Sequence, residues 1–221
     1  MAGGPVIVLL AALAAPPLPD YREEAIVGSW TELNRRITAS CTWPDGAAVP
    51  AACDPAALDA SIAWGRQVID EVADDGRIHY LIGLAHRYAG RPADAETELR
   101  EAVKLSPDRA EAWADLGDLL SARGLWGEAA KAFRNVARLR PEGPAAWYAW
   151  LQLAQIAANR HDPEGFESAL REALRLGFSL RTVAGNPAWR AWWADPAMRP
   201  TIERMVGSYA EPAVLDSLRA P

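Results

Sequence analysis

The sequence predicts an all-α fold, a right-handed superhelix of antiparallel helix hairpins with helical caps at both ends. Residues 76–143 repeat at a spacing of 34 positions, a period typical of stacked helical hairpins. Small residues, large apolar residues and a proline recur in register, because paired helices need close contacts, a filled interior and a defined end. The recurring pairs are Gly83 and Gly117, Gly90 and Gly124, Ala95 and Ala129, Leu99 and Phe133, Leu105 and Leu139, and Pro107 and Pro141.

The second copy of the repeat is the most complete. It reads Trp113-x-x-Leu116-Gly117, followed by Gly124, Ala129, Phe133 and Pro141. This pattern resembles the tetratricopeptide (TPR) repeat, and a third copy opens with Trp147, 34 residues after Trp113. The resemblance implies an array that binds other proteins or peptides, while the repeat positions themselves do not specify the partner.

Composition and charge narrow the class of partner. The chain has 221 residues, half of them hydrophobic, which is enough to bury a sizeable core. Its formal net charge is −6, and it has no run rich in lysine or arginine. Such a chain lacks the positive field that attracts phosphate backbones, so a nucleic-acid partner is not expected.

The first twenty residues indicate export. Residues 5–15 form an apolar run that suits the core of a secretory signal peptide and is too short for an ordinary membrane-spanning helix. Ala12-Leu13-Ala14 has the small-x-small pattern of a cleavage site, which places a signal peptide over residues 1–14. We therefore expect a periplasmic or secreted protein without a stable membrane span. The alternative is a cytoplasmic protein, because the first residues contain no lysine or arginine.

The two cysteines, Cys41 and Cys53, lie in a segment whose prolines and glycine indicate a loop. In an exported protein we expect a disulfide between them, which would stabilise the fold by closing that loop. The alternatives are two unrelated buried thiols or a zinc site. Zinc is disfavoured because two cysteines with no nearby histidine make only half a site.

Two helices are predicted before the repeats. Apolar residues from Ile26 to Ile37 follow helical spacing, which predicts an amphipathic helix over about residues 20–38. A second helix is expected to begin at Asp54-Pro55 and to run to the Asp-Asp-Gly turn before the repeats. We interpret the pair as an N-terminal cap hairpin, with the Cys loop, over residues 20–75, because terminal units of a solenoid often lack the repeat's small residues.

The repeats themselves occupy the middle of the chain. In the third repeat Leu151 replaces the first glycine, and about three inserted residues are expected in a longer turn over 159–164. The third hairpin is therefore expected to splay more than the other two. The predicted repeats span residues 76–109, 110–143 and 144–177, with helices over about 77–89 and 92–105 in the first and about 110–122 and 126–139 in the second.

Residues 178–221 are expected to close the array. The stretch 186–196 contains Trp189, Trp192 and Trp193, and it resembles the closing segment that follows bacterial TPR arrays. This resemblance implies a C-terminal cap over apolar surface that a fourth repeat would otherwise bury. The alternative is an exposed tryptophan patch that binds a partner.

Signals of catalysis and of metal binding are poor. The chain has none of the common nucleophile, phosphate-loop, zinc or redox motifs, so we expect no enzyme activity, no cofactor and no metal. His79 and His86 are seven residues apart, which does not suit a two-ligand metal site on one helix, and we interpret them as packing residues. His161 is expected in a solvated turn, and the basic stretch around Arg134 on a solvated helix face.

The TPR resemblance implies that the first helix of each hairpin lines a concave groove. In members that bind chaperone tails, asparagines help to hold a terminal carboxylate; Leu84 and Asp118 stand in their places, so that activity is not expected. The groove has a tyrosine and arginine end and a more acidic middle, which suits a peptide that supplies both an anion and a cation. The side chains expected to bind the partner are Arg77, Tyr80, Leu84, Arg87, Tyr88, Asp118, Tyr148 and Gln152.

These features together predict a non-enzymatic scaffold or adaptor that binds a protein or peptide partner in a bacterial envelope. The alternative is an accessory or sensory subunit of an enzyme complex that docks through the repeats. Binding through the convex side or the tryptophan-rich tail is a further alternative to the groove. A hydrolase built on the array is disfavoured, since no nucleophile with an orienting base is recognisable.

Overall fold

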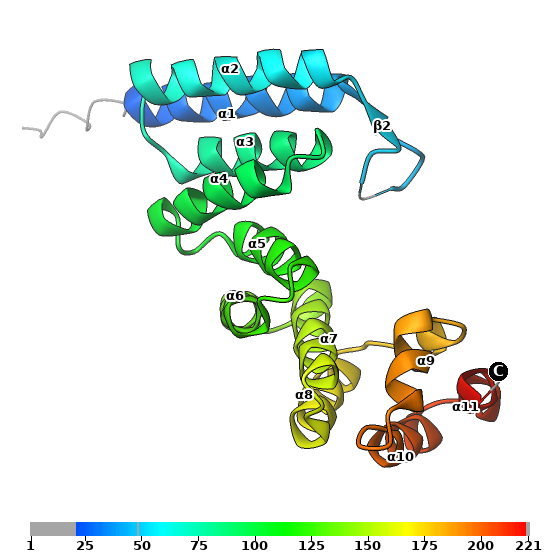
Figure 1. Cartoon of the computed structure of the whole chain (residues 1–221). Helices are drawn as coiled ribbons and strands as arrows, with labels where there is room; N and C mark the ends of the chain where they lie inside the picture. The colour runs from blue at the N-terminus through cyan, green and yellow to red at the C-terminus, as the bar shows by residue number, and fades with distance from the viewer. Residues whose placement is uncertain (1–20, 48, 220–221) are drawn as a thin grey trace, which may run out of the picture.

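The computed structural model describes residues 21–47 and 49–219, so the predicted signal peptide over residues 1–14 lies outside the described part of the chain. The predicted all-α solenoid of helix hairpins is confirmed, and Figure 1 shows the hairpins stacked one after another. The helices are α1 (Tyr21–Ala39), α2 (Pro55–Glu71), α3 (Gly76–Tyr88), α4 (Pro92–Leu105), α5 (Ala110–Ala122), α6 (Trp126–Leu139), α7 (Gly143–Asn159), α8 (Pro163–Arg175), α9 (Pro187–Ala194), α10 (Arg199–Tyr209) and α11 (Pro212–Arg219), with a short 3₁₀ helix η1 (Leu180–Val183).

The helices α1 and α2 form an antiparallel hairpin that packs on the first repeat (Figure 1). Leu33 of α1 and Leu58 of α2 are completely buried, and they belong to one apolar cluster with Ile78 and Ile82 of α3. This burial explains why the pattern of apolar residues predicted both helices. The second helix ends at Glu71, a few residues before the predicted end.

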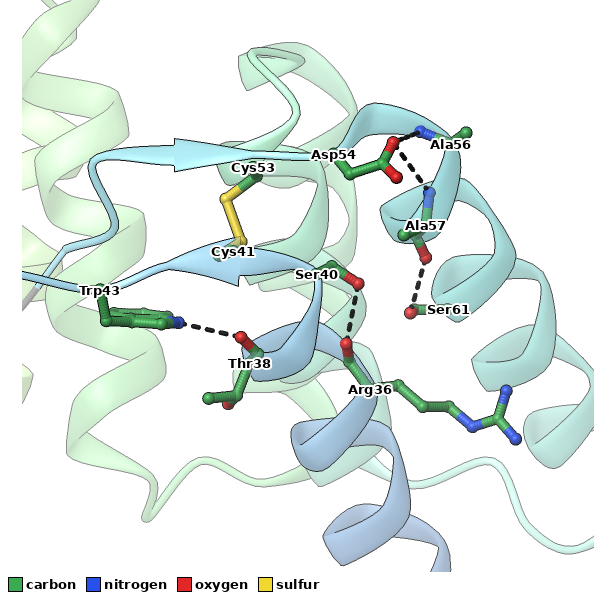
Figure 2. Close-up of a disulfide and its surroundings, with 10 residues drawn as sticks. All are labelled: Arg36, Thr38, Ser40, Cys41, Trp43, Cys53, Asp54, Ala56, Ala57 and Ser61. Atoms are coloured by element: carbon green, nitrogen blue, oxygen red, sulfur yellow. Dashed lines mark hydrogen bonds between the residues drawn. A yellow bond between two sulfur atoms is a disulfide. The ribbon is translucent and has the colours of Figure 1, made fainter.

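A small β-ribbon joins α1 to α2. The strands β1 (Cys41–Thr42) and β2 (Ala52–Cys53) pair antiparallel, with Cys41 opposite Cys53. The two sulfur atoms lie 2.04 Å apart, and Figure 2 shows the bond at the base of the loop. Asp54 follows directly and caps α2, because its side chain accepts a hydrogen bond from the Ala56 backbone N–H at 2.9 Å. The ribbon therefore leads straight into a capped helix.

The 34-residue period has a steric cause inside each hairpin. A Cβ atom at Gly83 would lie 3.0 Å from Leu99 Cγ, and one at Gly117 would lie 2.8 Å from Phe133 Cζ. Leu99 and Phe133 are both fully buried. Each glycine thus makes room for a large side chain of the paired helix, and the two residues must recur together.

The third hairpin differs from the prediction in the place of its extra residues. The turn over residues 160–162 is no longer than the turns over 89–91 and 123–125, so the predicted long turn is wrong. The extra residues lengthen α7, which has 17 residues where α3 and α5 have 13. His161 adopts φ 56°, the left-handed conformation that Gly124 adopts (φ 72°) in the preceding turn. His161 is therefore the counterpart of that glycine, shifted by 37 residues.

The C-terminal helices pack against the last hairpin of the array. Trp189 is 1% exposed and Trp192 is 7% exposed, so these two rings do not form the alternative surface patch. Both rings lie against Phe166 of α8, with ring centroids 5.6 and 6.5 Å apart. The Trp192 indole N–H donates to Asn159 Oδ1 at 3.0 Å, which satisfies its polar atom.

Candidate functional site

The first helices of the three repeats are linked by one polar network. The network consists of Tyr80, Arg87, Asp115, Asp118 and Tyr148, and we call it and the surface around it the first-helix face. The Tyr80 hydroxyl of α3 donates to Asp115 Oδ2 of α5 at 3.2 Å, and the Arg87 guanidinium donates to Asp115 Oδ1. Arg87 Nη2 also lies 3.9 Å from Asp118 Oδ2. The Tyr148 hydroxyl of α7 donates to Asp118 Oδ1 at 2.6 Å. Three successive hairpins are thus joined by four predicted binding residues and by Asp115, which was not predicted.

The network contains two carboxyl groups and one guanidinium. One guanidinium, that of Arg87, faces the carboxyl groups of Asp115 and Asp118. Burial raises the pKa of both carboxyl groups above the usual range, and Arg87 opposes that shift. Burial and the neighbouring carboxylates also raise the pKa of Tyr80 and of Tyr148, which remain neutral donors. Arg109 supplies a second guanidinium beside the network, 5.5 Å from the centre of the Tyr80 ring.

Other predicted binding residues lie at the edges of this network. Arg77 at the start of α3 binds Glu23 of α1, with its Nη2 2.9 Å from Glu23 Oε2, and it also binds Asp75. It therefore ties the N-terminal hairpin to the repeats. Tyr88, at the end of α3, is half-buried, and its ring meets the ring of Trp43 edge-on at 5.7 Å. Leu84 and Gln152 are half-buried as well.

Two residues of this surface were missed by the sequence analysis. Asp115 binds both Tyr80 and Arg87. The family resemblance does not assign its position to ligand contacts, because Asp115 comes one residue after such a position on α5. Its spacing of three from Asp118 places both carboxyl groups on one side of α5, and this was the available signal. Trp43 comes from the Cys loop, and nothing in the sequence indicates its contact with Tyr88.

The histidines of α3 have different environments. His79 Nδ1 lies 2.7 Å from Glu98 Oε2 and His79 Nε2 lies 2.9 Å from Asp74 Oδ1. His86 is only 4% exposed, and neither of its ring nitrogens has a hydrogen-bond partner among the described residues. His161 is exposed in its turn, where Nδ1 lies 2.5 Å from Asp195 Oδ2 and links the turn to the C-terminal helices.

These environments predict opposite effects of pH on stability. The hydrogen bond to Glu98 raises the pKa of His79, so its stabilisation is complete below about pH 6.5 and is lost as the pH rises through the folded-state pKa. Burial lowers the pKa of His86, so its contribution is present above about pH 6.5 and is lost as the pH falls through the folded-state pKa.

We therefore expect His86→Phe to lose less free energy of unfolding than the wild type between pH 7 and pH 5. The wild type should gain free energy of unfolding from His79 as the pH falls from 8 to 6.5, and His79→Phe should lack this gain. Urea unfolding at these pH values measures both changes, with each variant acting as the control for the other. Identical pH dependence in the two variants would contradict this assignment.

The part of the chain over residues 21–47 and 49–219 contains no group of three or more His, Cys, Asp or Glu side chains arranged to hold a metal ion. It also contains no helix that combines the length and the apolar character needed to cross a membrane.

Comparisons with known proteins agree with the architecture. The tetratricopeptide repeat family model matches residues 80–144 and 115–177. The protein HemY of Escherichia coli strain K12 is 34% identical over 107 residues, which are 48% of this chain and 25% of HemY. The chain therefore matches only a quarter of the length of this curated relative.

Solved structures show the same fold at low sequence identity. A crystal structure of the MamA protein has a TM-score of 0.62 and 14% identity, and the match covers 89% of this chain and 93% of MamA. The structure of pilF from Pseudomonas aeruginosa has a TM-score of 0.58 and 11% identity, over 90% of this chain and 77% of the other. With the period, the hairpins and the family match in agreement, residues 80–177 consist of tetratricopeptide repeats.

Proposed function

We propose that this protein is a non-enzymatic scaffold that binds a peptide or protein partner on its first-helix face. The observation that carries the proposal is the network of Tyr80, Arg87, Asp115, Asp118 and Tyr148. It fixes three hairpins relative to one another, so a partner that spans them meets a surface already held in place. Preorganisation of this kind reduces the entropy lost on binding.

The residues around the network supply contact area and hydrogen bonds. Tyr88 and Trp43 offer aromatic surface at one end, and Gln152 offers an amide on α7. Aromatic side chains carry a large share of the binding energy at protein interfaces. Arg87 is already bound to the two aspartates, and the network holds two carboxyl groups for this one guanidinium. We therefore infer a partner segment with a basic side chain, rather than one that supplies an anion to Arg87.

We further propose that the protein works in the periplasm or outside the cell. The apolar residues 5–15 and the adjacent Cys41 and Cys53 sulfur atoms support this location, because disulfides persist in oxidising compartments. Alkylation of the thiols followed by mass spectrometry tests the proposal on protein isolated from its own cell. Two freely alkylated cysteines would contradict export to an oxidising compartment.

Site-specific photocrosslinking in the native cell tests the binding surface. A photoreactive phenylalanine analogue placed at Tyr88 or at Gln152 should capture the same partner, because both positions flank the network. The matched control is the same analogue at Thr97, which is exposed on α4, the second helix of the first hairpin. Capture at Thr97 alone, or at all three positions equally, would contradict the proposed surface.

A further inference from the structure

A second candidate site lies away from the first-helix face, between α6, α7 and α8. A crevice of about 170 Å³ opens there, and we call it the second-helix crevice. Arg134 and Arg160 line it together with Trp150 and Leu153. It therefore combines two cations with an apolar wall.

The corresponding place between the hairpins of the first and second repeats, which we call the first interface, is filled by an ion-pair network. Glu96 of α4 is 8% exposed, and it accepts a hydrogen bond from Arg100 Nε at 2.9 Å and another from Arg123. Arg100 also donates to Glu128 of α6 at 2.6 Å. Two arginines are thus held by two carboxylates, and the carboxylate of Glu96 lies between both guanidinium groups.

The repeat relates these four residues to four residues that line the second-helix crevice. Helix α6 is the counterpart of α4 at a spacing of 34 residues, so Ala130 corresponds to Glu96 and Arg134 corresponds to Arg100. The turn before α8 and α8 itself are the counterparts of the turn before α6 and α6 at a spacing of 37 residues, which is the distance between the left-handed residues Gly124 and His161. Arg160 therefore corresponds to Arg123, and Gly165 corresponds to Glu128. The pairs of counterparts are Glu96 and Ala130, Arg100 and Arg134, Arg123 and Arg160, and Glu128 and Gly165.

The interface between the second and third repeats, which we call the second interface, therefore has both arginines of the first interface but neither of its two glutamates. Within the described residues, neither Arg134 nor Arg160 forms an ion pair with a carboxylate, and both are exposed. Asp162 also lines the crevice, but its Oδ1 accepts the Gly165 backbone N–H at 2.9 Å as the cap of α8. Ala130 stands where Glu96 stands in the first interface, so no carboxylate of α6 enters the crevice. At Gly165 the space beside Cα is taken by the Asp162 carboxylate.

We propose that the second-helix crevice binds a glutamate or aspartate side chain from an acidic segment of a partner protein. The carboxylate would take the position that Glu96 holds in the first interface, between the guanidinium groups of Arg134 and Arg160. Charge-assisted hydrogen bonds from arginine to carboxylate are stronger than neutral ones, which favours this occupant. An apolar side chain next to the acidic residue packs against Trp150 and Leu153. The site is independent of the first-helix face.

Nuclear magnetic resonance of the full chain tests this proposal with two peptides, N-acetyl-Leu-Glu-Leu-amide and the same peptide with glutamine. The glutamate peptide should shift the Nε–H signals of Arg134 and Arg160 and the indole N–H signal of Trp150. The Arg134→Ala, Arg160→Ala double variant should abolish binding. Ala130→Glu should weaken it at least tenfold, because the new carboxylate occupies the site from within, as Glu96 does in the first interface.

The matched control is Arg138→Ala, which removes an exposed arginine of the same helix that does not line the crevice. This variant should bind as the wild type does. Circular dichroism establishes that each variant is folded, and the double arginine variant decides the outcome if Ala130→Glu does not fold. Equal shifts with the glutamine peptide, equal shifts with acetate alone, or undiminished binding by the double variant would each overturn the proposal.

Discussion

Replacing Phe133 with alanine is expected to lower the free energy of unfolding by about 3–5 kcal/mol. The Phe133 ring is completely buried between α5 and α6, and it fills the space that Gly117 leaves open. Removing the ring creates a cavity that the rigid hairpin cannot close, because the backbone of α5 is fixed by its own neighbours. The ring also meets Tyr148 edge-on at 6.1 Å, so the loss should extend to the first-helix face.

Urea unfolding followed by circular dichroism measures this effect. Phe133→Leu is the matched control, because it keeps most of the apolar volume and should cost much less than the alanine variant. Gly117→Ala should destabilise as well, since its Cβ would lie 2.8 Å from the ring of Phe133. A loss of less than about 1 kcal/mol for Phe133→Ala would contradict the assignment of this ring to the repeat core.

Removing the bond between Cys41 and Cys53 is expected to lower the free energy of unfolding by about 3 kcal/mol. The expectation rests on the sequence separation of 12 residues, because a closed loop of this length restricts the unfolded chain. The loop joins α1 to α2 and carries Trp43, which contacts Tyr88 of the first repeat. The loss should therefore be accompanied by greater mobility at that end of the first-helix face.

The Cys41→Ser, Cys53→Ser double variant and the reduced wild type should unfold at the same lower urea concentration. Reductant should have no effect on the double variant, which makes it the control for other actions of the reductant. Equal stability of the oxidised and reduced wild type would show that the bond does not restrain the fold.

Much of the fold follows from local patterns in the sequence. The glycines at 83 and 117 and the large residues at 99 and 133 must recur together for steric reasons, so the period predicts both hairpins. Apolar spacing from Ile26 to Ile37 predicts α1 for a similar reason. These signals succeed because they report contacts within one helix or one hairpin.

Other features depend on contacts between distant segments and could not be predicted in this way. The sequence analysis places about three extra residues in the turn over 159–164, whereas in the structure α7 is longer. The added length of α7 follows only from the structure, where His161 adopts the left-handed conformation that Gly124 has at the same place in the preceding turn. The helices α10 and α11 were expected only as part of a capping segment.

The candidate site shows the same division. Tyr80, Arg87, Asp118 and Tyr148 were selected by their positions in the repeat, and the structure brings them together. The hydrogen bonds of Tyr80 and Arg87 to Asp115 were not predicted, because hydrogen bonds between hairpins leave no periodic signal. This pairing changes the expected partner from one that supplies both charges to one that supplies a cation.

Calorimetric titration of the partner captured from Tyr88 into purified protein tests the binding surface most directly. The Tyr88→Ala, Gln152→Ala double variant is expected to bind at least tenfold more weakly, a loss of about 1.4 kcal/mol or more. The Thr97→Ala variant on α4 should bind with unchanged affinity. Equal affinity of the wild type and the double variant, with both folded by circular dichroism, would contradict the claim that the first-helix face holds the partner.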